Sequence, residues 1–266
     1  MTRNQELDLS FARQCVYTFL ALAASDPRSK RWARLQDPAF QKASVESAAV
    51  LRERALQVKG DPAPGELPPD QFTLAPLVKY VAGSRDEVNE AFESVFGLLS
   101  SMECPPYETS YCPQTFSVFR SQKVADVAGF YLAFGVEPSR DKPERHDHIA
   151  LELEFMAWLI AKGPLAPDEG KARLTQDAQK KFFAEHLAWW VPAFARALRS
   201  KADGNAGPVR LAAPAKSYFG TLGRTLAAFV AVERRLLGIE PPTELVEAKE
   251  TDGTETPECE GCDLKG

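Results

Sequence analysis

The sequence predicts an all-α fold of about nine to eleven helices, in two halves joined by a hinge. Apolar residues recur along most of the chain with the spacing of one helix face. Glycines and prolines interrupt these patterns at the ends of the predicted helices. Strand-like alternation, hairpin dipeptides and an internal repeat of fixed period are all absent from the sequence.

The first half, residues 1–137, begins with a helix that is predicted over 9–24 and that Asp26–Pro27 ends. The stripe expected to face the core is Phe11, Cys15, Thr18 and Leu22, with Phe19 beside it. A short turn at 31–35 and a second helix over 40–58 follow. The apolar face of this second helix is thin, which indicates that one of its sides is solvated.

The rest of the first half is expected to hold a loop and two more helices, and the hinge follows it. Residues 60–69 are a loop by composition, and Ser84 to Glu87 is a capping box. The apolar residues of the helix that it starts are Val88, Phe92, Val95, Phe96 and Leu99. Another helical pattern runs from Phe116 until Gly135 stops it. Residues 138–144 are polar and contain two prolines, and we expect them to be the hinge.

The second half, residues 145–240, is predicted to contain the remaining helices. One begins within 144–156 and ends at Gly163–Pro164, and the next begins at 167–169. The expected buried face of the latter is Leu174, Ala178, Phe182 and Phe183. Pro192 marks a further helix start, and the last long helix covers 215–237. We expect 241–266 to be a flexible tail, because its composition buries too little apolar area to offset its ordering entropy.

The composition is that of an ordinary globular protein. The chain has 266 residues, of which 44% are apolar and 26% charged, so it is long enough to bury a core. Its net charge of -5 argues against a non-specific nucleic-acid binder. No window approaches the roughly 20 apolar residues of a membrane span, and the first residues do not follow the order of a secretory signal peptide. We therefore expect a cytoplasmic protein whose five cysteines are free thiols.

Ionisable side chains are most concentrated in residues 144–156. On a helix, His148 and Glu152 would share one face, while Asp147 would share the adjacent face with Leu151, Glu154 and Trp158. A second segment, residues 104–113, combines three prolines with two tyrosines. So much rigid and aromatic character is unusual for a simple connection, and we expect this segment to be the partner of the first.

Two alternatives accompany a binding role for these segments. His146, His148 and Glu152 could supply ligands to a helical metal-dependent enzyme, although no further ligand is evident and no metal site is predicted. Both segments could also serve packing alone. Neither a phosphate-binding loop nor a nucleophile elbow occurs in the chain, and Cys259 and Cys262 form a single CxxC pair in the predicted tail.

With these residues laid out, the chain resembles the TorD/DmsD family of molybdoenzyme maturation chaperones, also called redox enzyme maturation proteins. Three passages carry the resemblance: residues 105–111, residues 147–156, and His186–Leu187 with Trp190, Pro192 and Phe194. The resemblance covers roughly residues 85–240, and the all-helical prediction agrees with it. The chain departs from the family pattern in one position, where it has Arg145 and relatives usually have proline.

The resemblance implies a cytoplasmic, non-catalytic chaperone with no cofactor of its own. Such a protein binds the N-terminal leader, often twin-arginine, of a molybdopterin-dependent oxidoreductase subunit and assists cofactor insertion before export. Its partners would be that leader and the apo form of the catalytic subunit, with no nucleic acid and no stable membrane insertion. Either a monomer or a domain-swapped dimer is compatible with the predicted hinge.

The resemblance also carries over residue roles. The Asp-His pair that the family uses in leader recognition corresponds to Asp147 and His148, and Tyr107, Glu108 and Tyr111 match the second motif. A leader with paired arginines and an apolar stretch needs carboxylates for its guanidinium groups and an aromatic groove for the rest. The predicted leader-binding residues are Tyr107, Glu108, Tyr111, Asp147, His148, Glu152 and Trp158.

Overall fold

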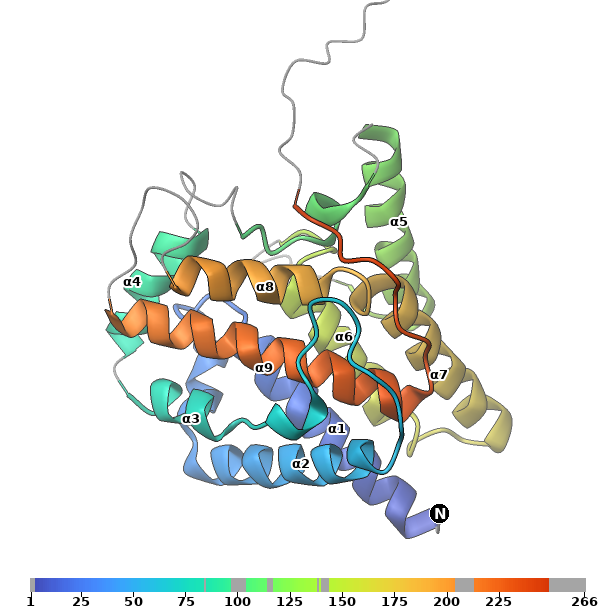
Figure 1. Ribbon diagram of the computed structural model, residues 1–266. Helices are drawn as coiled ribbons and strands as arrows, with labels where there is room; N and C mark the ends of the chain where they lie inside the picture. Colours follow the sequence, from blue (N-terminus) through green and yellow to red (C-terminus); the bar gives the residue numbers. More distant parts are fainter. Residues whose placement is uncertain are drawn as a thin grey trace, which may run out of the picture.

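The computed structural model describes residues 3–83, 85–96, 104–113, 117–137, 139, 144–203 and 213–248. Within these residues the chain forms nine α-helices and no β-strand, which confirms the predicted all-α class (Figure 1). The helices are α1 (Arg3–Ala23), α2 (Pro38–Leu56), α3 (Ala75–Val81), α4 (Arg85–Phe96), α5 (Ser117–Ala133), α6 (Ile149–Lys162), α7 (Glu169–Phe182), α8 (Val191–Ala202) and α9 (Ala213–Leu237). Short 3-10 turns are η1 (Lys30–Gln36), η2 (Pro69–Gln71) and η3 (Glu108–Tyr111), and η4 (Phe183–Leu187) is a π-helical turn.

Helices from both predicted halves share one core. The long helix α9 packs along α8 and also contacts α4, α3 and α2, while α1 packs against α2 and α6. One contiguous cluster of buried apolar residues therefore extends from α1 to α9. Figure 1 shows α5 rising at the edge of the bundle, on the side away from α2. None of the helices in the described part of the chain is both long and apolar enough to cross a bilayer.

Local sequence signals explain where the helices begin and end. Asp37 caps α2 by accepting a hydrogen bond from the Ala39 N–H at 3.0 Å, directly before Pro38. Asp168 caps α7 in the same way. Gly135 follows α5 with φ of 70°, a left-handed conformation that glycine adopts without steric cost. Several predicted features lie outside the described residues: Ser84 of the capping box, Leu99, Phe116 and most of the hinge.

A buried ion pair ties the first helix to the last. Arg13 on α1 donates from Nε to Glu233 on α9 at 3.0 Å and from Nη1 to Gln179 on α7 at 2.9 Å. The Tyr17 hydroxyl donates to the same Glu233 carboxylate at 3.0 Å. Because the carboxylate is fully buried, these donors replace the water that it loses on folding.

Three details of the predicted elements differ from the structure. Phe11 is 59% exposed, because the buried face of α1 is centred on Val16, Phe19 and Leu20 and the predicted stripe lies at its margin. Leu174 is 55% exposed, since α7 buries Thr175, Ala178, Gln179 and Phe182. Helix α6 begins only at Ile149, so Asp147 precedes the helix and does not share a face with Leu151, Glu154 and Trp158.

The described part of the predicted tail follows the surface of the bundle. Leu245 and Val246 pack against the core, and Glu247 accepts a hydrogen bond from Arg196 Nη2 at 2.7 Å. Leu245 also packs against Gly65. A Cβ at this glycine would lie 2.7 Å from the Leu245 side chain, so there is no room for a larger residue at position 65. Residues 249–266, including both cysteines of the CxxC pair, lie outside the described part.

Candidate functional site

The two segments that the sequence singles out are joined by their backbones. Tyr107 and His148 form an isolated antiparallel bridge. The Glu108 N–H donates to the Asp147 carbonyl at 2.9 Å, and the Ile149 N–H donates to the Pro106 carbonyl at 2.9 Å. The predicted partnership between residues 104–113 and 144–156 is therefore confirmed.

Asp147 is the side chain that locks this junction. Its carboxylate is fully buried and accepts hydrogen bonds from the Thr109 N–H at 3.2 Å and the Thr109 hydroxyl at 2.6 Å. Arg145 adds two more, from Nε at 3.1 Å and Nη2 at 2.9 Å. The same guanidinium lies 4.3 Å from the centre of the Tyr107 ring. Asp147 thus points inward and holds the two segments together.

Glu108 lies in a buried polar cluster beneath the junction. It accepts a hydrogen bond from Trp189 Nε1 at 2.9 Å and lies 3.0 Å from His186 Nδ1, in the π-helical turn η4. Lys123 on α5 approaches to 3.5 Å. Burial raises the pKa of the Glu108 carboxyl, although His186 and Lys123 oppose that change.

Glu152 is the second buried carboxyl of this region. It lies on α6, is fully buried, and accepts a hydrogen bond from Trp190 Nε1 at 3.2 Å. Burial, reinforced by the charges of Glu108 and Asp147, raises the pKa of Glu152 well above its usual value. The ring of Tyr111 packs on Trp190 with centroids 5.4 Å apart and is also buried.

His148 connects the junction to α6. It is the N-cap residue of that helix, and its Nδ1 accepts a hydrogen bond from the Ala150 N–H at 3.1 Å. Its ring meets the Tyr107 ring edge to face at 5.3 Å. Burial lowers the pKa of His148, so the neutral imidazole that capping requires is favoured.

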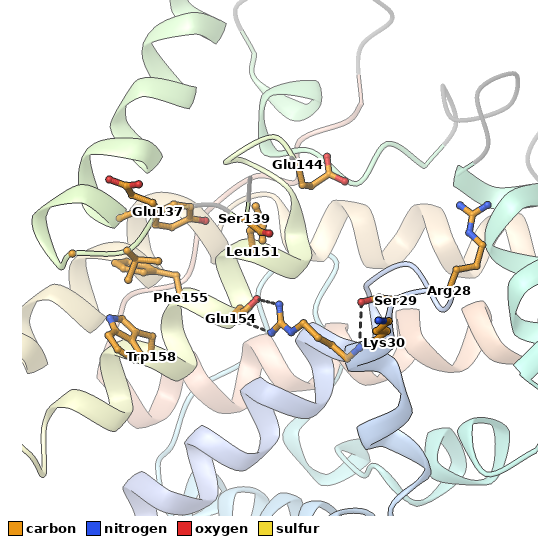
Figure 2. A pocket seen from close by; sticks show the side chains of 14 residues that line it. Arg28, Ser29, Lys30, Glu137, Ser139, Glu144, Leu151, Glu154, Phe155 and Trp158 are labelled. Atoms are coloured by element: carbon orange, nitrogen blue, oxygen red, sulfur yellow. Dashed lines mark hydrogen bonds and ion pairs between the residues drawn. The ribbon is translucent and has the colours of Figure 1, made fainter. Parts of the chain in front are cut away.

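A groove lies in front of this junction. Two adjoining cavities of about 870 and 510 Å³ share six lining residues, namely Arg28, Ser29, Arg31, Glu144, Leu151 and Glu154. We call the combined cavity the α6 groove. Figure 2 shows its larger part, with Phe155, Trp158 and Glu154 of α6 on one side and Arg28, Ser29 and Lys30 on the other. Charged and apolar side chains therefore line the groove together, as in many peptide-binding sites.

The structure separates the predicted site residues into two groups. Tyr107 and His148 line the smaller part of the α6 groove, and Trp158, which is 43% exposed, lines the larger part. The other four are buried and line neither part of the groove: Glu108, Tyr111, Asp147 and Glu152. The predicted site residues did not include Arg31 and Glu144, because no local pattern indicates that η1 faces α6 or that Glu144 lines the same groove.

The residues of the proposed metal site are engaged elsewhere. The His146 ring packs on Tyr131 with centroids 6.0 Å apart, the His148 imidazole caps α6, and Glu152 accepts a hydrogen bond from Trp190. Within the described ranges, no group of three or more His, Cys, Asp or Glu side chains is placed to hold a metal ion. His146, His148 and Glu152 therefore do not form the ligand set that the enzyme alternative requires.

Comparison with known proteins identifies the relatives of this chain. Residues 66–196 match the family model described as nitrate reductase delta subunit. The chain is 32% identical over 113 residues to the chlorate reductase assembly chaperone protein of Ideonella dechloratans, which covers 42% of this chain and 51% of the relative. It is 28% identical over 194 residues to the perchlorate reductase assembly chaperone protein of Dechloromonas aromatica, covering 71% and 78% respectively.

A third relative carries the name of the family that the motifs resemble. The chain is 30% identical over 98 residues to the chaperone protein TorD of Photobacterium profundum, covering 37% of this chain and 45% of the relative. The match thus spans about half the length of the chlorate reductase relative and of TorD. The junction and the α6 side of the groove lie within residues 66–196. The family match over residues 66–196 and these relatives support similarity of the chain to the TorD/DmsD family.

Proposed function

We propose that this protein is a cytoplasmic maturation chaperone for a molybdopterin-dependent oxidoreductase. It binds the N-terminal leader of the catalytic subunit, often a twin-arginine leader, and keeps the apo subunit ready for cofactor insertion before export. The protein performs no chemistry itself in this proposal. The names of its relatives, which are assembly chaperones for chlorate and perchlorate reductases, support a client of this class.

The observation that carries the proposal is the α6 groove. A leader peptide presents an apolar stretch and basic side chains, so its binding site needs apolar surface and carboxylates together. The groove offers Leu151, Phe155 and Trp158 as apolar surface, with Glu144 and Glu154 between its two parts. Its combined size suits an extended segment of several residues better than a small metabolite.

The predicted site residues take two roles in this proposal. Tyr107, His148 and Trp158 touch the leader, because they line the groove. The other four do not touch the leader but fix the shape of the groove from within the fold, because they are buried: Glu108, Tyr111, Asp147 and Glu152. The protein can perform both roles as a monomer or as a domain-swapped dimer.

Isothermal titration with the twin-arginine leader peptide of a molybdoenzyme from the same cell tests the proposal. We expect wild type to bind and Trp158→Ala to bind about tenfold more weakly, because it removes an exposed aromatic surface. Asp147→Ala is expected to weaken binding and also to lower the melting temperature, since it opens the junction. No binding of any such leader by wild type would contradict the proposal.

Phe119→Ala provides the matched control. Phe119 lies on α5 and is 46% exposed, which is close to the exposure of Trp158. It is not part of the α6 groove. The control variant should bind the leader as wild type does. An equal loss in Phe119→Ala and Trp158→Ala would show that the effect is not specific to the groove.

A further inference from the structure

An ion pair crosses the α6 groove where its two parts meet. Arg31 at η1 donates from Nη1 to Glu154 Oε2 at 2.9 Å, and Nη2 donates to the other carboxylate oxygen. The two residues belong to both parts of the groove. The guanidinium therefore sits on the Glu154 carboxylate in the two-pronged geometry that arginine uses to bind carboxylates.

This ion pair is exposed, in contrast to the buried ion pairs of the core. The side chains of Arg31 and Glu154 are 62% and 41% exposed, whereas Glu233 in the α1–α9 pair is fully buried. Exposed pairs contribute little to stability, because water solvates both charges when the pair opens. Arg31 can therefore leave Glu154 without disturbing the fold.

We propose that Glu154 receives an arginine of the bound segment, and that Arg31 occupies this place in the free protein. This inference rests on the leader-binding function proposed above and names its specificity-determining residue. The bound segment exchanges one guanidinium for another on the same carboxylate. Lysine is a poorer substitute, because a single ammonium group cannot bind both carboxylate oxygens with the same fixed geometry.

The surroundings of Glu154 support an arginine followed by apolar residues. Leu151 lies one turn before Glu154 on α6, and Trp158 lies one turn after it. Both line the groove, so side chains next to the bound arginine meet apolar surface. Figure 2 shows Glu154 between Leu151 and Trp158, on the face of α6 that is turned toward residues 28–30. Displaced from Glu154, Arg31 remains solvated at the edge of the groove.

Titration of a twin-arginine leader peptide and its twin-lysine counterpart into single variants tests the inference. Arg31→Ala should tighten binding of the arginine peptide about two- to fivefold, the range that an exposed ion pair supplies. Glu154→Gln should weaken it about five- to tenfold and abolish the preference over the lysine peptide. In the double variant, removal of Arg31 should give no further gain, because its carboxylate partner is already absent.

Arg28→Ala is the control for general electrostatics. Arg28 lines the same groove and carries the same charge, but it pairs with Asp26 and Glu93. Equal tightening by Arg28→Ala and Arg31→Ala would overturn the inference, because net charge alone would explain it. Unchanged affinity in Arg31→Ala, with wild type binding the leader, would overturn the inference and leave the proposed function standing. Absence of binding in wild type and Arg31→Ala alike would overturn both.

Discussion

Asp147 acts at the scale of single residues by joining two distant segments. It accepts four hydrogen bonds from Thr109 and Arg145 and has no exposed surface. We expect Asp147→Ala to lower the free energy of unfolding by about 2 to 4 kcal/mol, because Thr109 and Arg145 lose a charged acceptor. Urea denaturation followed by circular dichroism measures this change.

Asp126→Ala is the matched control for Asp147→Ala. Asp126 lies on the exposed face of α5, so its removal should change the free energy of unfolding by less than about 0.5 kcal/mol. Equal stability of Asp147→Ala and wild type would contradict the inward role of this carboxylate. Weaker leader binding by Asp147→Ala is therefore evidence about the binding site only when the stability of the variant is measured as well.

Glu152 should give the protein a distinctive pH dependence. Its folded-state pKa is raised above the ordinary value of 4.5, chiefly by burial. Between these two pKa values the folded protein retains a proton that the unfolded chain has lost. The free energy of unfolding therefore falls as pH rises through this window, by up to about 1.4 kcal/mol per pH unit.

Glu152→Gln should remove this contribution, because glutamine does not titrate. Denaturation of wild type and variant at several pH values above 4.5 gives the difference in slope. Parallel pH profiles of wild type and Glu152→Gln would argue against a raised pKa at Glu152.

At the scale of elements, close contact between α8 and α9 depends on one glycine. A Cβ at Gly223 on α9 would lie 2.7 Å from the Ala195 carbonyl oxygen on α8 and 3.1 Å from Leu198 Cβ. We expect Gly223→Ala to destabilise the protein by about 1 to 3 kcal/mol, because the two helices must separate. Thermal unfolding measures the effect.

Gly129→Ala shows what the same substitution does without a close neighbour. Among the described residues, no atom outside the backbone of its own helix lies within 4 Å of a Cβ at Gly129, which is inside α5. The change should stabilise the protein by about 0.5 to 1 kcal/mol, because alanine favours the helix more than glycine does. The opposite signs of the two variants separate helix packing from helix propensity. Loss of stability in both variants would refute this explanation.

At the scale of the whole molecule, the shared core predicts that the chain unfolds as one unit. Glu233→Gln should lower the free energy of unfolding by about 3 to 5 kcal/mol, because it leaves Arg13 buried without its ionic partner. Circular dichroism and tryptophan fluorescence should still report one coincident transition. Separate transitions would mean that the two halves of the chain have independent cores.

An exposed ion pair provides the comparison for Glu233→Gln. Glu247 pairs with Arg196 through side chains that are 76% and 49% exposed. Glu247→Gln should therefore change stability by less than about 1 kcal/mol. A similar loss in both variants would indicate that burial does not set the strength of these pairs.

The sequence predicts the elements of this fold better than their environments. Local signals such as Asp37 before Pro38 and glycine at 135 mark helix ends, because capping involves only neighbouring residues. The same signals cannot show that Phe11 is exposed, since exposure depends on which helices surround α1. Asp147 illustrates this limit at the site, because its inward position requires Thr109 from another segment.

The capping contact of His148 determines which nitrogen of its imidazole carries the hydrogen. Because Nδ1 accepts from the Ala150 N–H, the neutral ring must carry its hydrogen on Nε2. His148 is then a hydrogen-bond donor toward any further partner, and it matches a main-chain carbonyl of a bound segment but not a guanidinium. The start of α6 would thus contain two recognition sites. His148, at the cap, would bind the peptide backbone, and Glu154, in the second turn, would bind an arginine side chain.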